Sequence, residues 1–244
     1  MALNIQTFKT RALTALLFVA VMLTGLLWNF WSFLVLFTVI HFGCWFEFVK
    51  LMKKIYAEKY LGYCFFGLIY ITMPVLMMIH LSLEINYSDP SLSGAHFAMP
   101  AWIGSVFSSI IPCGIIFSIW INDTMAYLVG SFIGKTPLTK ISPKKTWEGT
   151  IGGIILCLIT IGFLYPVIIT NFSDSKVAGY IWFIIPAICA IFGTLGDLLE
   201  SKLKRMADVK DSGSFMPGHG GFLDRFDSLL VAVPFVWLYV KLFV

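Results

Sequence analysis

The chain has 244 residues, of which 59% are hydrophobic and 12% charged, and its formal net charge is +4. Soluble domains average about 25% charged residues, so this composition excludes an ordinary soluble protein and favours an integral membrane protein. A net charge this small predicts no nucleic-acid partner. All five cysteines lie inside apolar segments without a CxxC pair, which argues against disulfide or zinc sites.

Apolar segments long enough to cross a bilayer, at about 20 residues each, follow one another along the chain. In chain order they are Ala12–Trp28, Phe30–Val49, Leu61–Ile79, Ala101–Ile121, Gly149–Ile169, Val177–Leu195 and Ser228–Val244. Met125–Ile133 is too short to cross and is predicted to be a re-entrant or protein-buried helix. The predicted fold is therefore all-α, a polytopic transmembrane helix bundle of about seven spans with short re-entrant or interfacial helices. Residues 1–244 are predicted to form a single integral membrane domain, with N-terminal helices in 1–121 and the functional half in 122–244.

The positions of the basic residues predict how the spans are oriented. With these spans, 15 of the 17 Lys and Arg residues fall on one side of the membrane, since only Lys176 and Lys241 fall opposite. The positive-inside rule makes that side cytoplasmic. If Met125–Ile133 crossed the membrane, Lys140, Lys144 and Lys145 would change sides, which is why we reject it as a span.

Two cytoplasmic segments carry most of the polar chemistry, and the second of them is Gly196–Ser228. Asp197 is followed at helical spacing by polar residues that share its face: Ser201, Lys204, Arg205 and Asp208. The Gly-rich stretch KDSGSFMPGHGG cannot continue a helix and is predicted to form a tight loop. Its glycines let backbone N–H groups approach anionic oxygens, and His219 within it is predicted to be a site residue.

The chain then re-enters an apolar helix that carries Asp224 and Asp227. We predict that Asp197 and Asp224 meet at the membrane boundary. Paired carboxylates with phosphate oxygens nearby are the ligands that Mg²⁺ prefers. Basic side chains would neutralise those phosphates: Lys204, Arg205, Lys210 and Arg225. Interfacial anchoring by snorkelling side chains is the competing interpretation for each single charge.

The first polar segment is Trp120–Gly149. Asn122 and Asp123 stand where the fourth apolar segment ends, and Lys144 and Lys145 stand just before the fifth. Two lysines beside hydroxyl groups at a helix N-terminus are suited to phosphate binding, although the spacing is not that of a P-loop. A juxtamembrane basic patch that holds anionic lipid is the alternative.

Two polar residues within the second apolar segment, His41 and Glu47, also attract attention. An acidic side chain in such a segment is costly and tends to mark function. The sequence offers neither residue a partner, so helix packing or a lateral polar contact is the preferred interpretation.

The stretch from Ser201 to Asp227 resembles the signature of the phosphatidate cytidylyltransferases, also called CDP-diacylglycerol synthases. The matching positions are Ser201, Lys204, Arg205, Lys210, Asp211, Pro217, His219, Gly220, Gly221, Asp224, Arg225 and Asp227. SPKKTWEG at 142–149 and NDTMAYLVGSFIGK at 122–135 are also similar to that family. Met216 stands where the family usually has Leu, Ile or Phe. Asn122 replaces a frequent Gly or Ala, which leaves the role of Asp123 open.

The resemblance implies a Mg²⁺-dependent reaction of CTP with phosphatidate that yields CDP-diacylglycerol and pyrophosphate at the cytoplasmic face of the cell membrane. It implies Asp197 and Asp224 as catalytic metal ligands and Lys204 and Arg205 as catalytic cations. Substrate binding would fall to Ser201, Lys210, Asp211, His219, Gly220, Gly221, Arg225, Asp227, Asp123, Lys144 and Lys145. A monovalent cation could accompany Mg²⁺, and a homodimer is the family expectation.

Two other functions remain open. A CTP-dependent kinase of polyprenols or other lipid alcohols would transfer the γ-phosphoryl group and release CDP. A transporter of phosphorylated solutes would also use polar segments at helix ends. The full HGG-DR-D pattern argues against the kinase. The absence of repeated halves in the sequence argues against the transporter.

Overall fold

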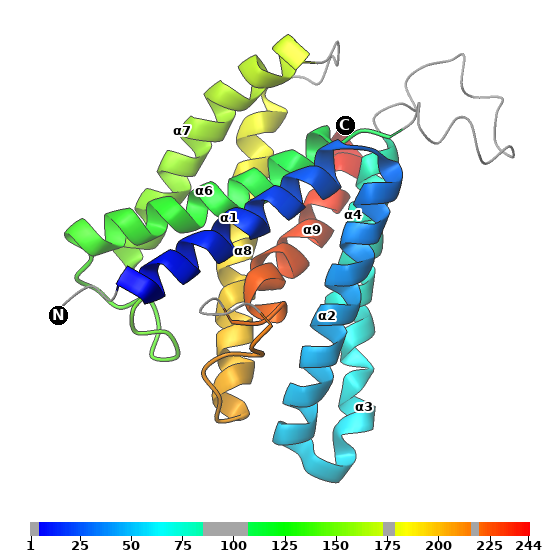
Figure 1. Cartoon of the computed structure of the whole chain (residues 1–244). Helices are drawn as coiled ribbons and strands as arrows, with labels where there is room; N and C mark the ends of the chain where they lie inside the picture. Colours follow the sequence, from blue (N-terminus) through cyan, green and yellow to red (C-terminus); the bar gives the residue numbers. More distant parts are fainter. Residues whose placement is uncertain (1–4, 85–106, 173–178, 216–219) are drawn as a thin grey trace, which may run out of the picture. The chain divides into compact units, whose positions relative to one another are not determined.

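The computed structural model describes residues 5–84, 107–172, 179–215 and 220–244 (Figure 1). Within these ranges the chain is helical and has no β-strand, apart from one isolated bridge between Pro137 and Thr146. The chain divides into two compact units. The first unit comprises residues 1–109 and 206–226, and the second comprises residues 110–205 and 227–244. The predicted all-α fold is confirmed.

The helices of the first unit are α1 (Ile5–Leu27), α2 (Phe30–Tyr56), the 3₁₀ turn Ala57–Lys59, α3 (Tyr60–Cys64), the π-helical turn Leu68–Thr72 and α4 (Met73–Glu84). Asn29 separates α1 from α2 and caps α2, since its side chain accepts from Ser32 N at 2.9 Å. The segment from α3 to α4 runs back along α2, as Figure 1 shows. Gly67 makes this return possible, because a Cβ there would lie 2.7 Å from the Trp45 ring.

The helices of the second unit are α6 (Ile110–Ile133), α7 (Trp147–Phe172), α8 (Ile181–Met206) and α9 (Leu223–Phe243), whose first turn belongs to the first unit. Glycines bring α6 and α7 together backbone to backbone. A Cβ on Gly149 would lie 2.7 Å from the Ala126 carbonyl oxygen, and one on Gly153 would lie 2.7 Å from the Ala126 Cβ. Small residues four apart are the usual means of close helix packing in membranes, where lipid tails remove the hydrophobic drive.

Two expectations about local structure were wrong. Met125–Ile133 is not a separate short helix but the last part of α6. The polar residues before it do not break the helix, because the Thr124 hydroxyl donates to Trp120 O at 2.8 Å within the same helix. Asp208 does not share the helical face of Asp197, because α8 ends at Met206 and Asp208 has φ 51°.

In the part of the chain that the structure describes, five helices are long and apolar enough to cross a membrane: Phe30–Cys64, Ile110–Ile133, Trp147–Ile169, Ile181–Met206 and Leu223–Phe243. Two shorter apolar helical stretches are Ala12–Leu27 and Leu68–Leu83, so the number of about seven spans stays a prediction. Large apolar side chains along these helices are exposed in the isolated chain, for example Phe163 and Phe46. Lipid is the natural partner of such surfaces, and the chain is a multi-pass membrane protein. Residues 80–100 contain no Lys or Arg, so the positive-inside rule predicts that they form an external loop, and most of them lie outside the described residues.

Candidate active site

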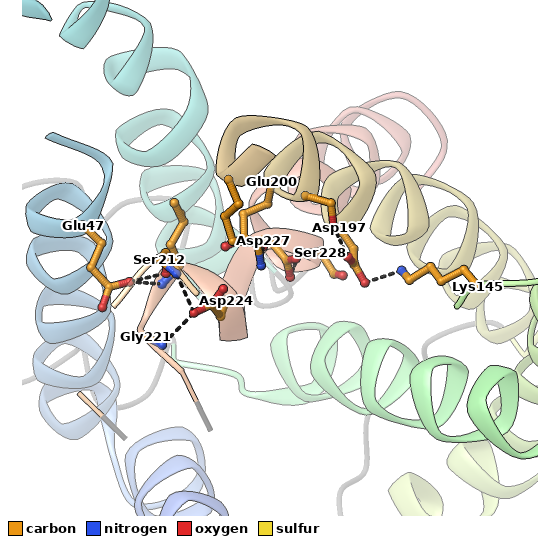
Figure 2. Close-up of polar contacts among 12 residues, drawn as sticks. Glu47, Lys145, Asp197, Glu200, Ser212, Gly221, Asp224, Asp227 and Ser228 are labelled. Carbon is orange, nitrogen blue, oxygen red and sulfur yellow. Dashed lines mark hydrogen bonds and ion pairs between the residues drawn. The ribbon is translucent and has the colours of Figure 1, made fainter. Parts of the chain in front are cut away.

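The polar residues of α8 and the loop before α7 meet in the second unit. The Lys145 ammonium forms an ion pair with Asp197 Oδ2, and the Ser201 hydroxyl donates to Asp197 Oδ1 at 3.3 Å. Figure 2 shows the Lys145 side chain reaching towards Asp197. The two side chains are each 30% exposed, so the pair remains open to solvent. Each of the two polar segments predicted to bind phosphates thus contributes a side chain to the same ion pair.

The loop between α6 and α7 holds Lys145 by a small set of backbone contacts. Leu138 N donates to Lys145 O at 2.7 Å, and Trp147 N donates to Thr136 O at 2.9 Å. Thr146 caps α7, since its hydroxyl oxygen accepts from Gly149 N at 3.1 Å. Lys145 therefore directly precedes Thr146, the residue that caps α7, as the sequence predicted.

Glu148 gives the same loop a second anchor. It lies in the first turn of α7 and accepts from Thr136 N at 3.1 Å and from Lys135 N at 3.2 Å. A carboxylate in this first turn also interacts favourably with the helix dipole. The start of α7 and the loop therefore form one folded piece that presents Lys145.

Asp227 lies buried where α9 packs on α8. Glycine permits this packing, because a Cβ on Gly196 would lie 2.5 Å from Asp227 O and 3.0 Å from Ser228 Cα. The Asp227 side chain is 7% exposed, and its Oδ1 accepts from Ser228 N at 2.6 Å. The charges of Asp197, Asp123 and Lys145 all act on it. Carboxylates from α6, α8 and α9 therefore share one electrostatic environment.

These carboxylates offer oxygen donors of the kind that Mg²⁺ prefers. Across the described ranges, no three His, Cys, Asp or Glu side chains lie close enough to enclose a metal ion. Mg²⁺ is commonly held by one or two carboxylates together with substrate phosphates and water. The donor set would therefore suit a Mg²⁺ ion only with a bound substrate to complete its coordination, and the Mg²⁺ site stays a prediction.

Lys204, a predicted catalytic cation, has an acidic neighbour one turn before it on α8. Its ammonium lies 2.5 Å from Glu200 Oε2, and the Glu200 side chain is only 1% exposed. Arg205 follows in the exposed last turn of the helix. Cations at a helix C-terminus also interact favourably with its dipole. The end of α8 thus presents two cations, one of them oriented by a buried carboxylate.

Asp224 organises the Gly-rich loop of the first unit. Its Oδ2 accepts from Gly221 N at 2.7 Å and from Ser212 N at 3.0 Å. Gly220 has φ 81°, a backbone conformation that residues with a side chain rarely adopt. A Cβ there would also lie 2.6 Å from Asp224 Oδ2. Asp224 and the two glycines of the predicted site are thus brought together. Asp197 belongs to the other unit, so its meeting with Asp224 stays a prediction.

Glu47 is a second carboxylate on this loop, and it was not predicted to be one. It extends from α2 and is 3% exposed. Its oxygens accept from Ser212 Oγ at 2.7 Å, Leu223 N at 2.9 Å and Phe222 N at 3.0 Å. Figure 2 shows this carboxylate turned towards Ser212. The lateral polar contact preferred for Glu47 is therefore a bond to the loop of the family signature.

His41, the other polar residue of the same segment, has a different environment. Its Nε2 lies 3.0 Å from Thr72 Oγ1, which also accepts from Trp45 Nε1 at 3.0 Å. These contacts join α2 to the π-helical turn Leu68–Thr72, so His41 makes a lateral polar contact, one of the two roles preferred for it.

The remaining predicted site residues lie on the surface or outside the described ranges. Those on the surface are Lys144, Lys210, Asp211, Arg225 and Asp123. The exposed lysines among them, Lys144 and Lys210, are open to a soluble anion. His219 and Pro217 lie outside the described residues.

The C-terminal part of the chain matches a known protein family. Residues 90–243 match the cytidylyltransferase family, and that stretch is more than half of the chain. The chain belongs to the cytidylyltransferase family. The matched stretch contains both polar segments, so Lys145, Asp197 and Asp224 are all part of the family's own region.

Individual relatives have a common name. A phosphatidate cytidylyltransferase of Staphylococcus saprophyticus is 47% identical over 117 residues, which are 48% of this chain and 43% of that protein. The Bacillus subtilis phosphatidate cytidylyltransferase is 44% identical over 126 residues, 51% of this chain and 45% of that protein. Phosphatidate cytidylyltransferase 5, chloroplastic, of Arabidopsis thaliana is 39% identical over 204 residues, 80% of this chain and 46% of that protein. The matches thus span slightly less than half the length of these relatives.

Three residues that contact predicted site residues or the loop of the family signature were not predicted to do so: Glu47 and Ser212 in the first unit and Glu200 in the second. Glu47 was visible as an acid within an apolar segment, but its partners were not. Glu200 precedes Lys204 by four residues, a spacing that predicts an ion pair on a helix. Ser212 gave no signal, because a serine in a Gly-rich loop is ordinary.

Proposed function

We propose that this chain transfers the cytidylyl group of CTP to phosphatidate. Membership of the cytidylyltransferase family supports the group transferred, and the names of the relatives support the acceptor. The observation that carries the proposal is the ion pair of Lys145 with Asp197, which joins the two polar segments in one unit. A cation beside carboxylates is what a polyphosphate and its metal need.

In the proposed reaction, a phosphate oxygen of phosphatidate attacks the α-phosphorus of CTP. The new bond forms between that oxygen and the α-phosphorus, and the bond to the bridging oxygen of the β-phosphate breaks. Pyrophosphate leaves with that electron pair. Phosphatidate is largely ionised near neutral pH, so the nucleophile needs no general base. Catalysis then depends on positioning and on neutralising charge.

The residues of the chain would divide these tasks. Lys145, Lys204 and Arg205 would bind phosphate oxygens, and Lys145 would exchange Asp197 for phosphate when CTP arrives. Asp197 would then be free to hold Mg²⁺, with Asp224 as the second proposed ligand. Bound Mg²⁺ would supply charge neutralisation on the α- and β-phosphates.

We also propose that the site faces the cytoplasm. With the predicted spans, most basic residues fall on the same side as the two polar segments, and the positive-inside rule makes that side cytoplasmic. CTP is a cytosolic solute, and the phosphatidate head group lies at the membrane surface. A site at the ends of apolar helices would let both substrates enter without extracting the acyl chains from lipid.

A labelling experiment would separate this reaction from the kinase alternative. The purified protein in detergent would receive phosphatidate, a polyprenol and Mg²⁺, with CTP labelled either at the α- or at the γ-phosphate. Cytidylyl transfer puts the α-label into lipid and the γ-label into pyrophosphate. A kinase would put the γ-label into lipid. No turnover by folded protein would favour the transporter.

Asp197→Asn tests the site within the same assay. Loss of the charge removes the partner of Lys145 and a proposed metal ligand, so we expect the rate to fall at least about a hundredfold. Asp208→Asn is the matched control, because Asp208 is exposed and Asn also tolerates its positive φ. Equal activity of the two variants would refute the site assignment.

A further inference from the structure

Glu47 binds the loop of the family signature from a helix that lies outside the matched family region. Its three donors are one hydroxyl and two backbone N–H groups, so no cation offsets its charge through these bonds. Burying a carboxylate is costly unless its oxygens are well satisfied, and hydrogen bonds to a charged acceptor are strong. Because burial of the Glu47 carboxylate carries this free-energy cost, its hydrogen bonds to the loop suggest a specific role.

The backbone donors are at the start of α9. Phe222 and Leu223 precede and begin this helix, and the first N–H groups of a helix have no partner within it. Glu47 thus acts as an N-cap supplied by another helix. Its negative charge also lies at the positive end of the α9 dipole. Asp224 is the second residue of that helix, so the cap fixes the segment that carries it.

Ser212 links the two carboxylates. Its hydroxyl donates to Glu47 Oε2 at 2.7 Å, while its backbone N–H donates to Asp224 Oδ2 at 3.0 Å. Gly221 lies between them as well, because its N–H donates to Asp224 and a Cβ on it would overlap both Glu47 oxygens. The loop is therefore held from two sides at the same residues.

The packing of α2 supports the same role independently. Gly43 lies one turn before Glu47 on α2, and a Cβ there would lie 2.5 Å from the Phe222 ring. The face of α2 thus offers a notch for the Phe222 side chain and an acceptor for its N–H. Both features act on the residue that precedes α9.

We propose that Glu47 is a positioning residue of the transferase: it holds the signature loop and the start of α9 so that Asp224 is presented to Mg²⁺ and substrate. The kinetic part of this inference rests on the proposed function. The part that concerns the loop depends on the hydrogen bonds alone.

Glu47→Gln is the sharpest variant, because it keeps size and shape but replaces one acceptor oxygen by a donor. Two of the three donors bond to Oε2 and the third to Oε1. The amide nitrogen must therefore face at least one backbone N–H in either orientation. Glu58→Gln, at an exposed position of the same unit, is the matched control.

The first readout is amide hydrogen exchange of the metal-free protein in detergent. We expect Glu47→Gln to raise exchange by about tenfold or more in peptides covering 220–226, and to leave α6 to α8 unchanged. Unchanged exchange in those peptides would overturn the inference, and so would a uniform rise along the chain, which indicates general destabilisation. Should Glu47→Gln fail to fold, Ser212→Ala removes one donor from Glu47 but keeps the backbone bond to Asp224, and the same criteria apply.

The second readout is the Mg²⁺ concentration that gives half-maximal cytidylyl transfer. A smaller fraction of active protein would lower the maximal rate without moving this concentration. Misplacement of Asp224 should raise it severalfold, and Glu58→Gln should not. An unchanged Mg²⁺ requirement with a lower rate would refute the positioning role. A wild type that makes no CDP-diacylglycerol would refute the proposed function instead, and the exchange measurement would still decide whether Glu47 holds the loop.

Discussion

At the residue scale, the backbone at the end of α2 is strained. Ala57 has φ 45° and ψ −116°, and its N–H donates to Lys53 O. A Cβ makes such positive φ values unfavourable by roughly 1–2 kcal/mol, whereas glycine adopts them freely. Ala57 is the C-cap residue of α2 and the first residue of the 3₁₀ turn that leads to α3.

Ala57→Gly should therefore stabilise the protein. The gain is expected to be about 1 kcal/mol, the steric cost less the greater entropy of glycine in the unfolded chain. Thermal unfolding in detergent would register it as a higher midpoint. Ala207→Gly is the control, since Ala207 is a buried alanine outside the positive φ region, and it should lower the midpoint. A lower midpoint for Ala57→Gly would contradict the strain argument.

At the element scale, α6 and α7 depend on the absence of side chains. At Gly153 the backbone of α7 lies close to the backbone of α6, because a Cβ there would lie 2.9 Å from Ala126 N as well as 2.7 Å from its Cβ. A backbone atom cannot swing aside as a side chain can. The two helices would have to move apart and lose the dispersion contacts that hold them.

Gly153→Ala should therefore destabilise the second unit, although alanine is the better helix former by about 1 kcal/mol. Overpacking of this kind costs roughly 1–3 kcal/mol. Gly62→Ala is the matched control, because Gly62 is also helical and a Cβ on it would meet nothing within 4 Å. We expect the thermal midpoint to fall for Gly153→Ala and to stay equal or rise for Gly62→Ala. The reverse order would exclude close α6–α7 packing.

At the scale of the whole molecule, orientation can be tested by chemical labelling. Lys140 and Lys210 are exposed residues of the two polar segments, predicted to face the cytoplasm together. Cysteines placed there should react with a membrane-impermeant maleimide in inverted vesicles and not in intact cells. Four native cysteines are buried, and the half-buried Cys64 would be replaced by alanine. Reaction of only one of the two positions in inverted vesicles would show that they face opposite sides.

Much of the fold could be predicted because a membrane helix is recognisable from the apolar residues of its own segment. Apolar runs identify the spans, and the starts of α7 and α9 follow the lysine pair and the Gly-rich loop that were expected to precede them. The continuity of α6 was missed, since the polar residues near Asp123 resemble a helix end. Their acceptance inside a helix depends on bonds such as that of Thr124 to Trp120 O.

The candidate site could be predicted only where its chemistry resides in residue types. Asp197, Ser201 and Lys145 are polar residues at helix ends, and the structure brings them together. The role of Glu47 could not be predicted, because its donors lie 165 to 176 positions away and two of them are backbone N–H groups. Every residue except proline carries a backbone N–H group, so no residue type at 222 or 223 could indicate a hydrogen bond to Glu47.

The bond from Glu47 to Ser212 also has a consequence for biosynthesis. A ribosome adds about 5–20 residues per second, so the 165 residues between these positions take on the order of ten seconds to make. Throughout that interval the nascent α2 carries an acid near the end of an apolar helix without the donors that later satisfy it. An acidic side chain at the centre of a membrane helix costs roughly 3 kcal/mol on insertion scales. The newly made α2 should therefore lie displaced along the membrane normal, with Glu47 closer to water. The signature loop, which is made later, then supplies the donors, and its synthesis sets the final depth of α2.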